Sequence, residues 1–169
     1  LVESYFSNMQ TISRIAKEKG LKAGICIQSM AFDNNGGSKW SNTNYYINDQ
    51  KNISMQLYSA LAFGYSYFNY FVYTTPMDLN DSETYTDSPV GWSDDKKSIV
   101  YNLMYDWVKN VNNEVKNFEN VLSEFTYRGT QVVGSLSGVT SDLTIGATAT
   151  YSALIGHYEK NGLKSYVVA

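Results

Sequence analysis

Cysteine and histidine are almost absent from this sequence of 169 residues, which contains only Cys26 and His157. A single thiol excludes an internal disulfide framework and a zinc site built from thiolates. A single imidazole leaves no Ser-His-Asp or Cys-His arrangement that does not include His157. We interpret Cys26 as a small hydrophobic residue in a buried strand. His157 is expected to be a structural residue of the core or surface, because metal ligands occur in groups.

Charged residues and long apolar runs are also scarce. Asp, Glu, Lys and Arg make up 17% of the chain, and the net charge is −3. Without a basic patch the chain has little with which to bind a phosphate backbone, so the composition argues against nucleic-acid binding. The longest apolar run, residues 58–73, is interrupted by Gly64, Ser66 and Asn69. It is too polar to span a bilayer.

Aromatic residues, by contrast, are abundant. The chain has 15 Tyr, 7 Phe and 3 Trp, which together are 15% of its residues, and its hydrophobic fraction is 43%. That fraction can bury enough apolar surface to offset the entropy of ordering the chain, so a folded protein is expected. Tyr and Trp combine a flat apolar face with a polar group, which suits stacking on sugar rings. The competing interpretation is that these rings form the core.

The N-terminal part of the sequence predicts a helix followed by a strand. Apolar side chains recur with the helical period over residues 2–19, and Gly20 is expected to end this helix as its C-cap. Residues 21–30 are short and almost wholly apolar, which is typical of a strand buried on both faces in a parallel sheet.

A second helix and strand follow after a long polar segment. Asp49 or Asn52 could cap a helix that runs to about Phe63, because both side chains accept hydrogen bonds from the first helical turn. Gly64 is expected to end it, and residues 65–73 form a second apolar strand rich in aromatics. The short joints from helix to strand and the long loops after strands indicate a β-α-β unit.

The character of the chain changes in its second half. A third helix is expected over residues 96–119, where apolar residues form one face. From Phe125 onward Gly, Thr, Ser and Val dominate, and Glu159–Gly162 is a hairpin turn signal. Alternating runs predict antiparallel strands at residues 127–133, 143–149, 153–158 and 164–168. We therefore expect a domain boundary between residues 124 and 125, because the two parts belong to different fold classes.

Several motifs in this order of elements carry a family resemblance. The second helix contains Leu57–Gly64 (LYSALAFG), and the strand after it contains Asn69–Tyr73 (NYFVY). The third helix contains Asn112–Lys116 (NNEVK), and residues 153–168 are rich in β-forming residues. The chain resembles the last quarter of the (β/α)8-barrel glycoside hydrolases of clan GH-A, nearest to the beta-galactosidase-like proteins of family 42. The resemblance covers nearly the whole chain.

The resemblance implies an α/β fold class and a carbohydrate substrate. Residues 1–124 would be the C-terminal part of a TIM (β/α)8 barrel, and residues 125–169 the start of an antiparallel β-sandwich. Both ends of the sequence look like cuts, so we expect an internal or C-terminal fragment that works with the rest of its own longer chain. The resemblance further implies a hydrolase of carbohydrate metabolism that acts on a β-linked oligo- or polysaccharide without a cofactor or metal. It also implies export from a bacterium, to the cell surface or beyond.

The position expected to carry the nucleophile holds a glutamine. In this clan the nucleophilic carboxylate lies at the tip of the seventh strand and the general acid/base at the tip of the fourth, which would precede Leu1. Gln28 best matches the nucleophile, but its amide is uncharged and cannot form a glycosyl-enzyme ester. The alternatives are a different register, a substitute carboxylate such as Asp33, a protein that lost hydrolysis and kept binding, or inverting or lyase chemistry with other residues.

Four residues of this segment are candidates for sugar binding: Gln28, Trp40, Tyr73 and Trp92. Gln28 and Tyr73 are placed at strand tips, where the active sites of barrels gather. Trp40 and Trp92 are placed in loops that follow strands, where their rings could stack on sugars. Each also has a structural interpretation. Gln28 could bind backbone groups of a loop, Trp40 and Trp92 could anchor their loops, and Tyr73 could be a ring of the core.

Other features favour structural interpretations. An acidic loop could bind calcium through oxygen ligands, but it lacks EF-hand spacing and is typical of a solvated loop. Its residues are Asp78, Asp81, Glu83, Asp87, Asp94 and Asp95. Gly36-Gly37 is interpreted as a flexible turn. A self-sufficient α+β domain without a barrel is a further alternative, which is less favoured because it would expose the edges of a parallel sheet.

Overall fold

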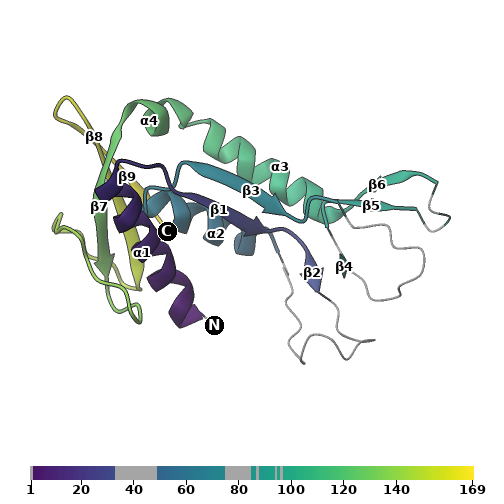
Figure 1. Cartoon of the computed structure of the whole chain (residues 1–169), viewed down its shortest axis with the longest axis horizontal. Coiled ribbons are helices and arrows are strands. Elements are labelled where there is room, and N and C mark those ends of the chain that lie inside the picture. Colours follow the sequence, from purple (N-terminus) through teal and green to yellow (C-terminus); the bar gives the residue numbers. More distant parts are fainter. Residues whose placement is uncertain (1, 33–48, 75–84, 87, 94, 96) are drawn as a thin grey trace. The chain divides into compact units, whose positions relative to one another are not determined.

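Helices and strands are mixed along the chain, which is compatible with the α/β class (Figure 1). The computed structural model describes residues 2–32, 49–74, 85–86, 88–93, 95 and 97–169. Its helices are α1 (Val2–Lys19), α2 (Gln50–Ala62), α3 (Leu103–Lys116) and α4 (Glu119–Glu124). Its strands are β1 (Gly24–Gln28), β2 (Ala31–Phe32), β3 (Tyr67–Phe71), β4 (Tyr85–Thr86), β5 (Val90–Trp92), β6 (Ile99–Tyr101), β7 (Thr126–Val133), β8 (Ala153–Lys160) and β9 (Leu163–Val168).

Glycines end the first two helices, as predicted. The amide of Gly20 (φ 65°) donates to Lys17 O over 3.2 Å, and that of Leu21 donates to Ala16 O over 2.8 Å. Helix α2 ends in the same way at Gly64 (φ 79°), whose amide binds Leu61 O. This is the Schellman arrangement, which needs a left-handed residue that glycine adopts without a Cβ clash.

The N-terminus of α2 identifies its capping residue. The backbone amide of Asn52 donates to Asp49 Oδ1 over 3.3 Å, so of the two candidates Asp49 is the cap. An acceptor at this position satisfies one of the amides that the first turn of a helix leaves without a partner.

Strands β1 and β3 form a parallel pair joined through α2 (Figure 1). Near the start of the pair, Ser66 N donates to Ala23 O over 2.9 Å, and near its end Ser29 N donates to Phe71 O over 2.9 Å. The partners advance in the same direction along both strands, which defines parallel pairing. The predicted β-α-β unit is therefore confirmed.

The expectation that the strand within residues 21–30 is buried on both faces is wrong, because β1 contains exposed and half-buried residues as well as a buried one. Exposed and half-buried residues alternate along β3, and its Tyr67 and Phe71 are 58% and 54% exposed. Cys26 on β1, expected to be buried, is also exposed. Within the described residues this sheet contains two strands only. Because alternate residues of a strand point to the same face, the exposed Tyr67 and Phe71 show that one face of the pair lies open.

The predicted third helix begins later than the sequence indicates. Residues 99–101 form β6, which pairs antiparallel with β5, and α3 starts only at Leu103. Asn102 separates them, because its Nδ2 donates to Ser88 O over 2.8 Å and its backbone amide donates to Pro89 O over 3.0 Å. The helix also breaks after Lys116, before α4. The β-branched residues Ile99 and Val100 suit a paired strand better than a helical turn.

The C-terminal sheet has the order β7-β8-β9 and is antiparallel throughout. Its hairpin between β8 and β9 turns through Asn161 (φ 51°) and Gly162 (φ 81°), which confirms the predicted turn. The strand predicted at residues 143–149 is wrong, because the side chain of Gln131 takes the place of a partner strand. Its Oε1 accepts from Ile145 N over 2.7 Å, and its Nε2 donates to Ala147 O over 2.9 Å.

The chain divides into two compact units. Residues 1–25, 55–69 and 117–169 form the first unit, and residues 26–54 and 70–116 form the second. The predicted boundary at 124/125 falls between α4 and β7, and it stays a prediction.

In the first unit, the C-terminal end of α2 packs against the β7-β8-β9 sheet. Three buried side-chain hydroxyls donate to consecutive carbonyls there: Tyr158 to Leu61 O, Thr130 to Ala62 O, and Ser13 of α1 to Phe63 O. Gly156 of β8 lies so close that a Cβ would stand 2.5 Å from Ala62 O. The sheet can therefore approach the helix only where β8 lacks a side chain.

The second unit contains β5, β6 and α3, together with the first turn of α2. Gln50 binds α3 through Glu114 and Asn110, over 3.3 Å and 3.2 Å. The hydroxyl of Tyr70 donates to Asn112 Oδ1. Burial raises the pKa of Tyr70 to about 12, against a smaller lowering by that hydrogen bond. These contacts tie α3 to the end of β3 and the start of α2.

We expect Gly156→Ala to destabilise the protein by about 3 kcal/mol, at the upper end of typical overpacking costs. The added Cβ would meet backbone atoms of Ala62, which cannot rotate away. Gly20→Ala is the matched control, because open space surrounds that position and only its positive φ should cost about 1 kcal/mol. Urea denaturation measures both. Equal losses would contradict the close approach of β8 to α2.

Stability should also fall in alkali. Burial, and next the neighbouring Tyr5, raise the pKa of Tyr65 to about 12 from its ordinary 10.0. Between pH 10 and 12 the Tyr65 hydroxyl is deprotonated in the unfolded chain but still protonated in the folded protein. The contribution of this hydroxyl to the free energy of unfolding is therefore complete below pH 10 and is lost as the pH rises toward 12. Tyr65→Phe should reduce this slope.

The Tyr65→Phe variant should also cost about 1 kcal/mol at neutral pH, since it removes the hydrogen bond to Met9 O. Urea titrations across the alkaline range measure the slope, and an unchanged slope in the variant would argue against the raised pKa.

Candidate functional site

The carboxyl ends of β1 and β3 bring two of the predicted site residues to one edge. Gln28 is the last residue of β1, and Tyr73 follows the end of β3 by two residues. Ser29, which is fully buried, joins the two strand ends, because its Oγ donates to Val72 O over 3.2 Å and its amide binds Phe71 O. We call Gln28, Ser29 and Tyr73 the strand-tip edge.

The amide of Gln28 is half-buried and engaged with the backbone. Its Nε2 donates to Met30 O over 3.0 Å, so the side chain helps to hold the turn that follows β1. This contact agrees with the structural interpretation of Gln28. A second role in sugar binding stays a prediction. An amide holds no negative charge, so nucleophilic attack on a sugar carbon is outside its chemistry.

Tyr73 is half-exposed at 44% and anchors the next element through its backbone. Its carbonyl accepts from Val90 N over 3.0 Å, and the neighbouring Thr74 forms a parallel bridge with Val90. Partial burial raises the pKa of the Tyr73 hydroxyl, with further contributions from Tyr105 and Tyr101. The hydroxyl is therefore protonated at neutral pH and can donate a hydrogen bond.

Trp92 lies on the hairpin that starts from this anchor. In the register of β5 and β6, Trp92 stands opposite Ile99, and Val90 stands opposite Tyr101. Opposed and alternate residues share a face of a β-ribbon, so Trp92, Ile99 and Tyr101 lie on one face. Trp92 is 42% exposed and Tyr101 is 67% exposed.

Two aromatic residues that sequence reasoning missed complete this surface. The ring of Tyr101 lies 4.6 Å from that of Tyr105 in the first turn of α3, with the planes inclined by 46°. We call Tyr73, Trp92, Tyr101 and Tyr105 the aromatic row. The sequence signal that could have revealed it is the β-branched pair Ile99-Val100 directly before Tyr101, which suits a strand rather than a helix.

Several predicted site residues lie outside the described part of the chain. These are Asp33, Trp40, the Gly36-Gly37 turn and, of the acidic loop, Asp78, Asp81, Glu83, Asp87 and Asp94. Asp95 is described, and it accepts hydrogen bonds from Ser93 Oγ and then from Lys97 N, which both lower its pKa. Among the described residues, no group of three His, Cys, Asp or Glu side chains could hold a metal ion.

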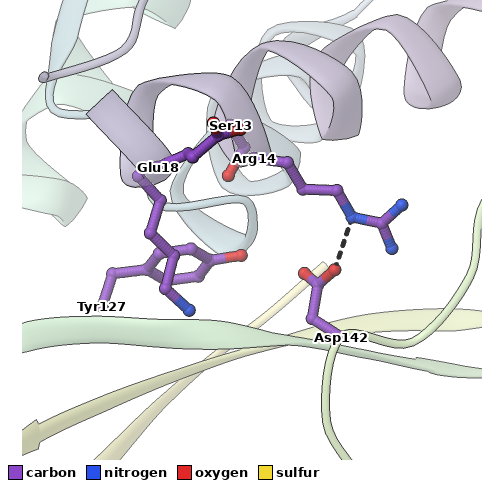
Figure 2. A pocket seen from close by; sticks show the side chains of 6 residues that line it. Ser13, Arg14, Glu18, Tyr127 and Asp142 are labelled. Carbon is purple, nitrogen blue, oxygen red and sulfur yellow. Dashed lines mark hydrogen bonds and ion pairs between the residues drawn. The ribbon is translucent and has the colours of Figure 1, made fainter. Parts of the chain in front are cut away.

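A hollow of about 360 Å³ lies in the first unit, between α1 and β7 (Figure 2). Three of its charged groups bind one another or the adjacent backbone, since Arg14 Nε lies 2.7 Å from Asp142 Oδ1 and Lys17 donates to Arg128 O, while the fourth, Glu18, pairs with Lys19 beside it on α1. The other oxygen of Asp142 accepts from Thr130 N over 3.2 Å. Because these partners are internal, the hollow joins the helix to the sheet, and we assign it a structural role.

His157 is a buried residue of β8. It is 8% exposed, and its ring stacks on Tyr166 with centroids 5.2 Å apart. Its Nε2 has no hydrogen-bond partner within the described structure. Gly129, its cross-strand partner on β7, contributes no side chain.

The chain matches no protein-family model and no curated protein sequence. No helix within the described ranges is long and apolar enough to cross a membrane.

Proposed function

We propose that this chain is part of a glycoside hydrolase-like protein that binds a β-linked oligo- or polysaccharide at the strand-tip edge. Residues 1–124 would supply the C-terminal part of a (β/α)8 barrel, and residues 125–169 the start of a β-sandwich. The observation that carries the proposal is the group of exposed aromatic side chains, Tyr73 and Trp92 among them, beside the carboxyl ends of two parallel strands.

The barrel is supported by the open face of the β1–β3 pair. Parallel sheets occur almost only where both faces are covered, yet Tyr67 and Phe71 are more than half exposed. Additional strands and the closure of a barrel would cover these rings. Barrel enzymes place their active sites at the carboxyl ends of the strands, which is where the strand-tip edge lies.

A carbohydrate ligand is supported by the chemistry of the side chains. A sugar ring presents an apolar face of C–H groups and a rim of hydroxyls, which match an aromatic face and its polar group. Trp92 offers an indole face, and Tyr73 offers a ring with a protonated hydroxyl. Gln28 adds an amide that can both donate to and accept from sugar hydroxyls.

Two versions of the function differ in catalysis. In the first, the protein hydrolyses the glycan with carboxylates that lie outside the strand-tip edge, the acid/base coming from an upstream strand. In the second, Gln28 replaces a lost nucleophile, and the protein is a non-catalytic carbohydrate binder on the same fold. Retaining glycosidases need two carboxyl groups about 5 Å apart, and Gln28 cannot be one of them.

Trp92→Ala should weaken binding of a β-linked oligosaccharide about fivefold, because an aromatic stack contributes about 1 kcal/mol. Gln28→Ala and Tyr73→Phe should each also reduce the affinity, through lost hydrogen bonds. Tyr151→Ala is the matched control, since Tyr151 is 83% exposed and lies in the other unit. Isothermal titration calorimetry measures the affinities. Unchanged affinity in all three site variants would remove the assignment of this edge.

Gln28→Glu distinguishes the two versions, because it restores a carboxylate of the same shape. A gain of aryl β-glycoside hydrolysis would identify a degenerate enzyme whose acid/base is still present. Loss of an existing activity would show that the glutamine has its own catalytic role. The release of the coloured aryl group measures both outcomes, with Gln28→Ala as the control.

A further inference from the structure

The three-stranded sheet of the first unit has two edges, and the edge at β7 is closed by a segment that follows it in the chain. The amide of Val132 donates to Ser141 Oγ over 2.9 Å, and that hydroxyl donates to Val132 O over 3.3 Å. Thr130 is satisfied in a similar way by Asp142, whose amide donates to Thr130 O over 2.8 Å and whose Oδ2 accepts from Thr130 N over 3.2 Å. A further strand therefore cannot pair with β7 at these residues.

The opposite edge of the sheet, at β9, is open. Leu154 and Ala169 exchange two backbone hydrogen bonds, each of 2.9 Å. In an antiparallel ladder such pairs alternate with pairs whose amides and carbonyls point away from each other. In the register of β8 and β9, the backbone groups of Lys164, Tyr166 and Val168 therefore point away from β8. These three residues are exposed, and no other described strand pairs with β9.

This edge has few of the features that prevent an exposed strand from pairing. Strand β9 contains no proline, and its pairing with β8 has no register shift. Tyr166 is 46% exposed and Val168 is 61% exposed, so pairing there would remove apolar surface from water. The ring of Tyr166 already stacks on His157 with centroids 5.2 Å apart, and a ring held in this way loses little conformational entropy on binding.

We propose that β9 pairs antiparallel with β9 of a second copy of this chain, around a two-fold axis at Tyr166. This is the one register in which all three outward-pointing residues are paired. Tyr166 stands opposite its counterpart, and Lys164 of each copy stands opposite Val168 of the other. Each of the three residues then exchanges both of its backbone hydrogen bonds. The inference concerns a partner of the first unit and does not depend on the proposed sugar site.

Charge and symmetry favour a second copy as the occupant of this edge. The register places the ammonium group of Lys164 opposite a valine, so that like charges do not stand opposite each other. A two-fold interface uses the same surface on both copies. Because the β7 edge is closed, each copy offers one edge, and the assembly ends at two chains.

The test is sedimentation equilibrium of the full chain, whose apparent mass should rise with concentration toward twice that of one chain. Val168→Lys places an ammonium group opposite Lys164 of the other copy, and Val168→Glu places a carboxylate there. The axis repeats the change, so the dimer dissociation constant of Val168→Lys should exceed that of Val168→Glu by about tenfold. High salt should narrow this difference. Leu103→Lys and Leu103→Glu are the matched controls, because Leu103 is 65% exposed and lies in the other unit.

Amide hydrogen exchange followed by NMR tests the register separately. At low concentration the amides of Lys164, Tyr166 and Val168 should exchange quickly, because they point to solvent, while those of Ser165 and Val167 should exchange slowly, because they point to β8. At high concentration all five amides should be protected.

Three outcomes would overturn the proposal. A chain that stays monomeric at every concentration excludes a second copy as the partner of β9. A dimer that is equally stable in both Val168 variants, or that responds to the Leu103 variants instead, forms at another surface. Protection of the Tyr166 amide that does not change with concentration would show that the edge is covered within one chain.

Discussion

The structure of the first unit depends on the carbonyl groups at the C-terminal end of α2. A helix leaves its last carbonyls without partners inside the helix, and burial makes such a group costly. Here hydroxyls from three separate elements donate to them: Ser13 of α1, Thr130 of β7 and Tyr158 of β8. One helix end therefore holds a helix and two strands in place, and Gly156 allows the approach that these hydrogen bonds require.

The same helix end sets the course of β3. Gly64 turns the chain out of α2, and within three residues Ser66 and Tyr67 donate to Ala23 O, which starts the parallel pair. The pairing ends at Ser29, whose buried hydroxyl and amide bind the end of β3. Parallel strands end at the same edge of a sheet. Gln28 and Tyr73 therefore lie at one edge although they are far apart along the chain.

The strand-tip edge and the aromatic row have different chemical characters. Gln28 is tied to Met30 O and is neutral, which suits holding a turn and binding hydroxyl groups. Trp92 and Tyr101 present partly exposed rings on the β5–β6 hairpin, and Tyr101 packs against Tyr105 in the first turn of α3. The hollow between α1 and β7 has neither property, because its ion pair and backbone contacts are internal.

Local chemistry by itself determined the two N-terminal helices, their glycine ends and the Asn161-Gly162 turn, and it limited the cap of the second helix to Asp49 or Asn52. Each depends on residues within a few positions of one another, where helical period and positive φ act directly. Tertiary structure decided the irregular segment at 143–149 and the exposure of Cys26, and it decided the strand at Ile99–Tyr101, which the β-branched pair Ile99-Val100 favours only weakly. These depend on partners far along the chain: β5 for β6, the Gln131 amide for residues 145–147, and the presence or absence of a layer over β1. The pairing of β6 with β5 decides which of their side chains share a face. Tyr101 and Tyr105 could therefore be added to the candidate site only from the structure.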